Sequence, residues 1–148
     1  MESRAASDPE EQAHPWFEEI DHTADLCLRA RGATLEELFA NAARGMFHLM
    51  RCEPGVRPHR MSRHILLQAG DLEALLVDWL NELLYLAEAE QELFDTYDIT
   101  HLGETRLEAT VRGATDHAPQ RGIKAATFFD LEVTHSSTGY QATITFDV

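Results

Sequence analysis

The stretch DLEALLVDWLNELLYLAEAE, residues 71–90, decides the fold because apolar side chains recur along it at helical spacing. The apolar stripe advances in steps of four, three, four and three residues through Leu72, Leu76, Trp79, Leu83 and Leu86. Further leucines widen this stripe, which predicts a deeply buried helix. Asp71 stands directly before the stripe. Its short carboxylate makes a good N-cap, so the helix is expected to begin after it.

A second helix is predicted upstream, where Thr34 and Glu37 form the capping box TLEE. The apolar residues that follow are again three and four positions apart: Leu35, Leu38, Phe39, Ala42, Met46 and Leu49. This pattern is typical of a helix that buries one face. The helix should fade near residues 50–52, before Pro54 and Gly55.

Most of the remaining chain alternates apolar and polar residues, which indicates β-strands. The expected strands are residues 16–20, 26–30, 65–67, 93–99, 105–112, 123–133 and 140–146. The turn Ser136–Gly139 should join the last two as a hairpin. Because strands and helices do not alternate regularly, we predict an α+β domain, with two helices packed on a mostly antiparallel sheet. This single domain should span residues 14–148, after a disordered acidic leader at residues 1–13.

The composition excludes several classes of protein. The chain has 148 residues, of which 26 are acidic and 12 are lysine or arginine, so its formal net charge is −14. Such a charge repels phosphate backbones and argues against autonomous or sequence-specific nucleic-acid binding. There is no run of about 18 apolar residues for a membrane span and no signal-peptide core, so a cytoplasmic location is expected. Cys27 and Cys52 are too few and too far apart for a metal or disulfide framework.

Three charged residues could carry chemistry. Asp25 stands where a loop enters a strand, and Asp147 is followed only by Val148 and its carboxylate. The carboxylates of Asp147 and of the chain terminus are neighbouring anions, which repel unless a cation joins them. Ca²⁺ or Mg²⁺ would suit such oxygen ligands. The alternative is a frayed acidic terminus. Lys124 is the only lysine. It could neutralise a carboxylate or phosphate, or simply protect a strand edge.

Other motif searches give weaker indications. His22 could act as a ligand or general base, or could hydrogen-bond within its own loop. The basic segment 57–64 could contact RNA or an acidic partner, or could be a solvated loop that balances the acidic helix. There is no GxSxG nucleophile motif and no glycine-rich phosphate loop. No catalytic residue is therefore assigned from the sequence.

Several segments together resemble the archease family. The block DHTADL at residues 21–26 resembles the family's HTAD signature. The other matching segments, in the family's order, are TLEELF at 34–39, DLEALL at 71–76, KAAT at 124–127 and FDV at 146–148. The resemblance departs after KAAT, because Phe128 and Phe129 stand where many members have Tyr-His. It also departs at Cys27, where a glycine is common.

The resemblance implies a function as well as a fold. Archeases are small cytosolic α+β proteins without an established reaction of their own, and they assist the RtcB-type RNA ligase. That GTP-dependent enzyme joins 3′-phosphate RNA ends in tRNA splicing and repair, and archease promotes its guanylylation and multiple turnover. The resemblance also implies a divalent cation, calcium in the family, with Mg²⁺ or Mn²⁺ as further possibilities. Its ligands would be Asp25, Asp147 and Val148, with Lys124 and His22 in the same functional cluster.

Two functional hypotheses follow from the sequence. The first is a non-catalytic activator of an RNA ligase, which fits the missing nucleophile and the negative charge. The second is a stand-alone metal-dependent hydrolase that uses Asp25, Asp147 and His22. Its weakness is that an open catalytic metal site needs about three protein ligands, and the sequence names few.

Overall fold

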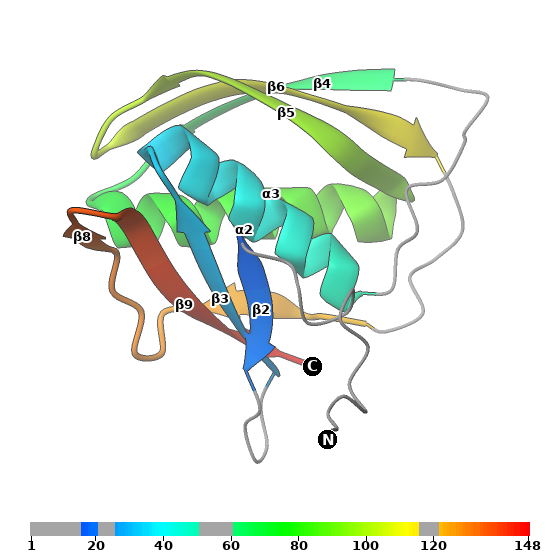
Figure 1. Cartoon of the computed structure of the whole chain (residues 1–148). Helices are drawn as coiled ribbons and strands as arrows, with labels where there is room; N and C mark the ends of the chain where they lie inside the picture. The colour runs from blue at the N-terminus through cyan, green and yellow to red at the C-terminus, as the bar shows by residue number, and fades with distance from the viewer. Residues whose placement is uncertain (1–15, 21–25, 51–60, 116–121) are drawn as a thin grey trace, which may run out of the picture.

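Two helices lie between two antiparallel sheets in the computed structural model (Figure 1). The structure describes residues 16–20, 26–50, 61–115 and 122–148. The larger sheet contains strands from both ends of the described chain, and the smaller sheet contains strands from its middle. The α+β prediction is confirmed. The division of the strands into two sheets that enclose the helices was not predicted.

Both helices begin where their capping residues predicted. Helix α2 spans Leu35–Leu49, and the Thr34 hydroxyl accepts a hydrogen bond from the Glu37 amide at 3.1 Å. The Glu37 carboxylate in turn accepts from the amide of Ala33 at 3.0 Å, which completes a reciprocal cap. Helix α3 spans Leu72–Ala89, and Asp71 accepts from the amide of Ala74 at 2.8 Å. None of the helices in the described part of the chain is long and apolar enough to cross a membrane.

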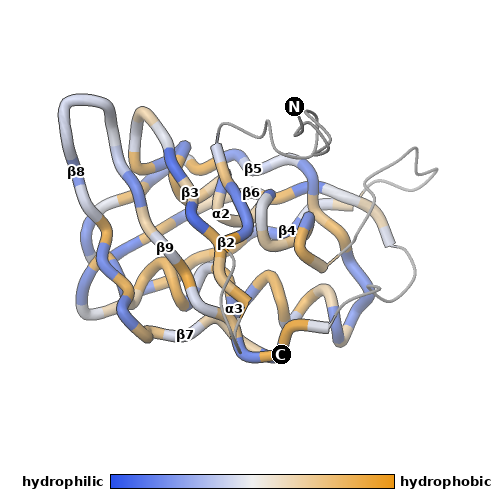
Figure 2. Tube along the Cα trace, turned by 60° about the horizontal axis from the view of Figure 1, so that its bottom comes forward, coloured by the Kyte–Doolittle hydropathy of each residue, from blue (hydrophilic) through white to orange (hydrophobic). Residues whose placement is uncertain are grey.

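The helices meet around Trp79, which is completely buried. Its indole Nε1 donates a hydrogen bond to the carbonyl oxygen of Phe39 in α2 at 2.9 Å, so the ring joins the two helices and loses no polar partner. Figure 2 shows hydrophobic residues recurring along α3. Gly45 lets α2 approach the larger sheet closely, because a Cβ there would lie 2.8 Å from the Leu28 methyl carbons. The apolar stripes read from the sequence are therefore the core.

The larger sheet has the order β2-β3-β9-β7, and β8 also pairs with β9. Its strands are β2 (Phe17–Ile20), β3 (Leu26–Gly32), β7 (Ala125–Thr127), β8 (Thr134–Ser136) and β9 (Gly139–Asp147). Strands β3 and β9 are its centre, with Leu26 opposite Phe146. Cys27 in β3 is a buried free thiol 3.5 Å from the Thr145 hydroxyl.

The smaller sheet has the order β4-β6-β5, with β4 (Met61–Gln68), β5 (Glu92–Leu102) and β6 (Arg106–Thr115). Strand β4 is longer than predicted and takes in residues 61–64, so the alternative of a solvated loop is wrong for this part of the basic segment. Arg63 there binds both carboxylate oxygens of the buried Glu92 through Nε, at 3.0 and 3.1 Å. Hydrogen bonding to Glu92 raises the pKa of Arg63.

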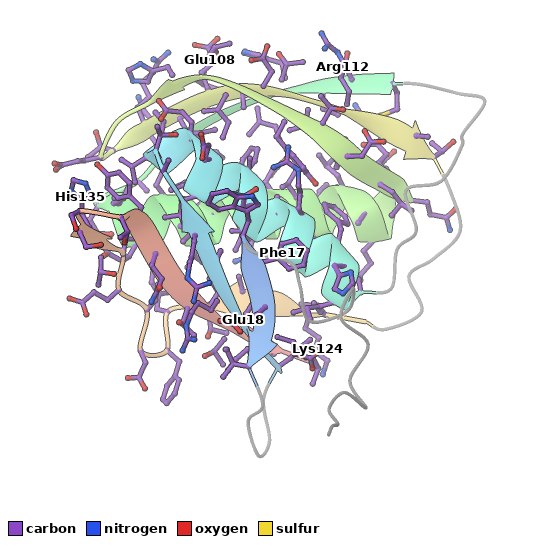
Figure 3. The ribbon with its side chains drawn as sticks, in the orientation of Figure 1. Phe17, Glu18, Glu108, Arg112, Lys124 and His135 are labelled. Atoms are coloured by element: carbon purple, nitrogen blue, oxygen red, sulfur yellow. The ribbon has the colours of Figure 1, made fainter. Side chains whose placement is uncertain are left out.

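The outer face of the smaller sheet carries a second ion pair. The His64 ring nitrogen Nε2 lies 2.8 Å from the Glu108 carboxylate, and Arg106 lies 3.4 Å from its other oxygen. The hydrogen bond with His64 lowers the pKa of Glu108. Glu108 and Arg112 project from this face in Figure 3.

The predicted strand 123–133 is mostly wrong, because only Ala125–Thr127 pairs with β9. The Thr127 hydroxyl donates to the Thr145 carbonyl at 2.8 Å and accepts from the amide of Phe129 at 3.3 Å, which turns the chain away from the sheet. A turn follows, closed by the hydrogen bond from the amide of Leu131 to the carbonyl of Phe128 at 3.0 Å. The hairpin turn predicted at Ser136–Gly139 is confirmed beyond it, but the strand that enters this turn is Thr134–Ser136 and not the predicted 123–133.

In that hairpin Ser136 pairs with Gly139 across a two-residue turn. Gly139 has a φ of 123°, which is strained for residues with a Cβ. The rings of His135 and Tyr140 stack with their centroids 4.1 Å apart, which supports the pairing of β8 with β9. The hairpin lies at the end of the larger sheet away from Lys124 (Figure 3).

Candidate functional site at the end of strands β7 and β9

The pairing of β7 with β9 brings Lys124 to the end of β9. Ala125 lies opposite Asp147, and the main-chain amide of Lys124 donates to the Asp147 carbonyl at 2.8 Å. Val148 follows Asp147 directly. Lys124, Asp147 and Val148 therefore occupy one corner of the larger sheet, which we call the β7–β9 corner. Figure 3 shows Lys124 beside the end of β9. These three were predicted to be functional from separate parts of the sequence.

The side chains of the corner face solvent. Lys124, Asp147 and Val148 are all exposed, and among the described residues neither Lys124 nor Asp147 forms a side-chain ion pair. Nothing in the described part of the fold thus neutralises the Lys124 ammonium or the Asp147 carboxylate. A cation and an anion displayed in this way are available to a phosphate, a metal ion or a partner protein.

The other predicted ligands lie outside the described residues. They are Asp25 and His22. The predicted leader at residues 1–13 also lies outside the described residues. Leu26, the residue after Asp25 in the sequence, pairs with Phe146, the residue before Asp147. Strand β3 therefore begins beside the end of β9, where Asp147 lies.

The corner offers oxygen donors to a metal ion. Within the described ranges there is no group of three metal-ligating side chains. The Asp147 carboxylate and the main-chain oxygen of Val148 are hard oxygen donors on exposed residues, and they could share an ion with water. They fit a weakly held Ca²⁺ or Mg²⁺ better than Zn²⁺, which takes nitrogen and sulfur ligands in its typical protein sites.

Asn81 of α3 holds the strand that carries Lys124. Its side-chain amide donates to the carbonyl of Ala126 at 3.2 Å, and its Oδ1 accepts from the amide of Ala126 at 2.8 Å. Strand β7 has three residues and, among the described strands, pairs only with β9, so Asn81 satisfies the other edge of the strand as a further strand would. The larger sheet and α3 together fix the main chain two residues from Lys124.

A groove of about 420 Å³ runs between α3 and the start of β7. Lys124 and Ala125 line one side of it, and Tyr85 and Glu88 line the other. The Tyr85 ring is 62% exposed, although it is a large aromatic side chain. The β7–β9 corner is thus continuous with a groove that has an aromatic wall.

The sequence reasoning missed Asn81 and Tyr85. Both lie within the stretch that was read as a buried helix with acidic polar positions. A signal was present, since Asn81 is the only amide between Leu72 and Ala89 and Tyr85 interrupts the run of leucines. The partners of Asn81 are 45 residues away in the sequence, so the helical pattern alone could not indicate them.

Phe128 and Phe129, which depart from the family's motif, lie within the described residues. Phe128 and Phe129 directly follow β7, and both rings are exposed. They stand in the turn that leaves the larger sheet after Thr127. Neither ring supplies a metal ligand or moves a proton, so these positions contribute apolar surface beyond the end of β7.

Together, the fold and the corner define a small α+β protein with an open charged corner beside a helix groove. A model of the Archease protein family matches residues 17–148 of the chain. The chain therefore belongs to the archease family. Protein archease of Methanosarcina mazei is 34% identical over 140 residues, and that of Methanosarcina barkeri is 36% identical over 140 residues. Each alignment covers 89% of this chain and 95% of the relative.

Solved structures agree with this assignment. The solution structure of Methanobacterium thermoautotrophicum protein 1598 matches with a TM-score of 0.68 at 31% identity, over 89% of this chain and 98% of that one. The crystal structure of an archease and possible chaperone from Thermotoga maritima matches with a TM-score of 0.59 over 87% of this chain and 94% of that one. At 22% identity the second match supports the fold alone.

Proposed function

We propose that this archease-family protein activates an RtcB-type RNA ligase in the cytoplasm. It would promote guanylylation of the ligase, so that the enzyme joins 3′-phosphate RNA ends repeatedly in tRNA splicing and RNA repair. The protein itself would not be the catalyst. The observation that carries this proposal is the pairing of β7 with β9, which sets the family's KAxT lysine, Lys124, beside Asp147 on an exposed corner.

The chemistry of the corner suits work beside phosphate groups. The Lys124 ammonium is a compact charge that binds a phosphate oxygen well. Asp25, Asp147 and Val148 are the proposed ligands of a divalent cation, with water in its remaining positions. A bound cation would add positive charge near the GTP phosphates of the ligase or alter the placement of the ligase's own metals. Asp147 and Lys124 would orient this charge from the rigid end of the sheet.

The overall charge also suits a ligase partner. An enzyme that binds RNA exposes basic residues around its RNA channel, because phosphate contacts supply much of the affinity. This chain carries a formal charge of −14, so long-range attraction would raise the rate of encounter with such a surface. Direct binding of nucleic acid by this chain would be disfavoured for the same reason.

The test is a multiple-turnover ligation assay with the ligase of the same organism. Wild-type protein is expected to raise both guanylylation and the number of ligations per enzyme. Lys124→Ala and Asp147→Ala should abolish this stimulation while remaining folded, and Asp25→Ala should behave in the same way. Leu66→Ala, at an exposed position of the smaller sheet, is the control and should stimulate fully. Full stimulation by folded Lys124→Ala would contradict the proposed role of the corner.

Calcium binding is tested separately by calorimetric titration. Asp147→Asn should weaken binding, because it removes one anionic ligand, and extra residues added after Val148 should weaken it as well. Equal affinity of the extended and the unextended protein would remove Val148 from the ligand set.

Incubation of the isolated protein with phosphate esters and divalent metals tests the hydrolase alternative. Ester cleavage that depends on Asp147 would favour a hydrolase over an activator.

A further inference from the structure

The solvent side of α3 carries one exposed aromatic ring among carboxylates. On a helix, residues three, four and seven positions apart share a face, so Asp78, Glu82 and Glu88 lie on the same side as Tyr85. Between Leu72 and Ala89 there is no lysine, arginine or histidine to balance these charges. Exposed tyrosines with an apolar body and a polar tip are enriched where proteins meet other molecules.

The charge of Glu88, near the end of α3, does not stabilise the helix. The carbonyl end of a helix carries partial negative charge, so acidic residues there are unfavourable. Glu88 lies in the last turn of α3, which has no basic residue, whereas Glu90 at the C-cap interacts with Arg63 and helps to raise its pKa. Helix α2 has the opposite arrangement, with Glu36 and Glu37 in its first turn and a histidine in its last. The helix end therefore does not account for Glu88, whose exposed carboxylate is available to a partner.

The groove links this surface to the candidate site. Tyr85 and Glu88 line it together with Lys124, and the described part of the chain forms no ion pair between Glu88 and Lys124. A partner group that enters the groove would contact Tyr85 and Glu88 at one wall and the base of the β7–β9 corner at the other. Binding there would orient the corner toward whatever the partner holds.

We propose that Glu82, Tyr85 and Glu88 form a docking surface for an arginine-bearing basic surface of the partner protein. This inference rests on the proposed function, in which the partner is the RNA ligase. A guanidinium group would stack on the exposed face of the Tyr85 ring. Its N–H groups would donate to the carboxylates of Glu82 and Glu88, one helical turn to either side. The basic rim of an RNA channel supplies arginines of this kind.

Charge complementarity selects this occupant over the others. A nucleic-acid strand would place its phosphates against Glu82 and Glu88, which repel them. A second copy of this chain would carry the same formal charge of −14, which opposes its approach to this acidic surface, and Arg63 and His64 of its basic segment are already paired within the chain. A basic surface of another protein meets both the ring and the carboxylates.

The experiment measures binding of the full chain to the ligase by calorimetry at low and high salt. Tyr85→Ala should weaken binding about tenfold, whereas Tyr85→Phe keeps the ring and should stay within about twofold of wild type. Glu82→Gln combined with Glu88→Gln should weaken binding about tenfold at low salt and less at high salt. The matched controls are Leu66→Ala for an exposed apolar side chain and Glu104→Gln for an exposed carboxylate, and both should bind as wild type does.

Two further readouts separate docking from folding and from the corner. Glu88→Gln should not lower the melting temperature, because it removes a charge that the helix end disfavours. At saturating concentration every α3 variant should stimulate ligation to the wild-type plateau, since the β7–β9 corner is intact. Loss of that plateau despite full occupancy would overturn a pure docking role.

The remaining outcomes distinguish this inference from the proposed function. If the wild type does not bind the ligase, the proposed function and this inference both fail. If the wild type binds and the α3 variants bind equally well, only this inference fails. Light scattering that shows a wild-type dimer and a monomeric Tyr85→Ala would assign the surface to a second copy of the chain and overturn the partner proposed here.

Discussion

The helix layer and the β7–β9 corner are held by different kinds of interaction. In the layer, α2 and α3 bury large apolar side chains, among them Phe39 and Trp79, between the two sheets. The corner buries little and depends on hydrogen bonds, one from the main-chain amide of Lys124 to the Asp147 carbonyl and two between the Asn81 side chain and the main chain of Ala126. The layer therefore determines whether the chain folds. The corner uses few directional bonds to place charged side chains where solvent and partners reach them.

The largest predicted effect is on the layer. Trp79→Ala removes a completely buried ring and the indole hydrogen bond to the Phe39 carbonyl, so it should lower the free energy of unfolding by about 3–5 kcal/mol. Urea unfolding followed by circular dichroism measures the change. Trp16→Ala is the matched control, because that ring is 46% exposed, and it should cost far less. Similar losses in both variants would mean that Trp79 does not organise the layer.

The second prediction concerns the bond between the layer and the corner. Asn81→Ala leaves the amide and the carbonyl of Ala126 without their side-chain partner, which should cost about 1–3 kcal/mol. Hydrogen exchange at the Ala126 amide should accelerate more than exchange elsewhere in the larger sheet. Asn81→Asp keeps the acceptor for that amide and should protect it better than alanine does. Unchanged protection in Asn81→Ala would show that β9 alone holds β7.

The sequence predicted the layer better than the corner, and the reason is physical. Apolar spacing and caps are local, so Thr34, Asp71 and the leucines around Trp79 indicated both helices correctly. The strand predicted at residues 123–133 was mostly wrong, because the Thr127 hydroxyl bonds to Thr145 and turns the chain. The alternation of apolar and polar residues indicates local structure only, and it cannot indicate a hydrogen bond to a residue 18 positions away.

The candidate site was predicted in part and by a different route. Lys124 and Asp147 were selected as a lone lysine and a terminal carboxylate and by resemblance to the archease motifs. The register of β7 on β9 brings them together, and a sequence pattern does not give that register. Asn81 and Tyr85 were missed because their roles depend on which strand packs beside α3.

The third prediction is a small effect on stability at the corner itself. Lys124→Ala and Asp147→Ala remove exposed side chains without an ion pair among the described residues, so each should change the free energy of unfolding by about 0.5 kcal/mol or less. Asp25→Ala is expected to behave alike. Thermal melts of the purified variants, compared with wild type, measure this. A loss of several degrees in Lys124→Ala would assign the lysine to folding and weaken its proposed role toward phosphate.

The smallest effect is expected far from the corner, at Glu108. Its hydrogen bond with His64 lowers the pKa of this carboxyl in the folded protein, below the ordinary glutamate value of about 4.3. A carboxyl whose pKa falls on folding stabilises the fold above its ordinary pKa, and this contribution is lost as the pH drops through the folded value. The melting temperature of wild type should therefore exceed that of Glu108→Gln at pH 7, and the difference should shrink toward pH 3. Glu104→Gln, an exposed carboxylate without such a bond, should show no comparable trend. A difference for Glu108→Gln that is the same at both pH values would mean that the His64 bond does not favour the ionised carboxylate.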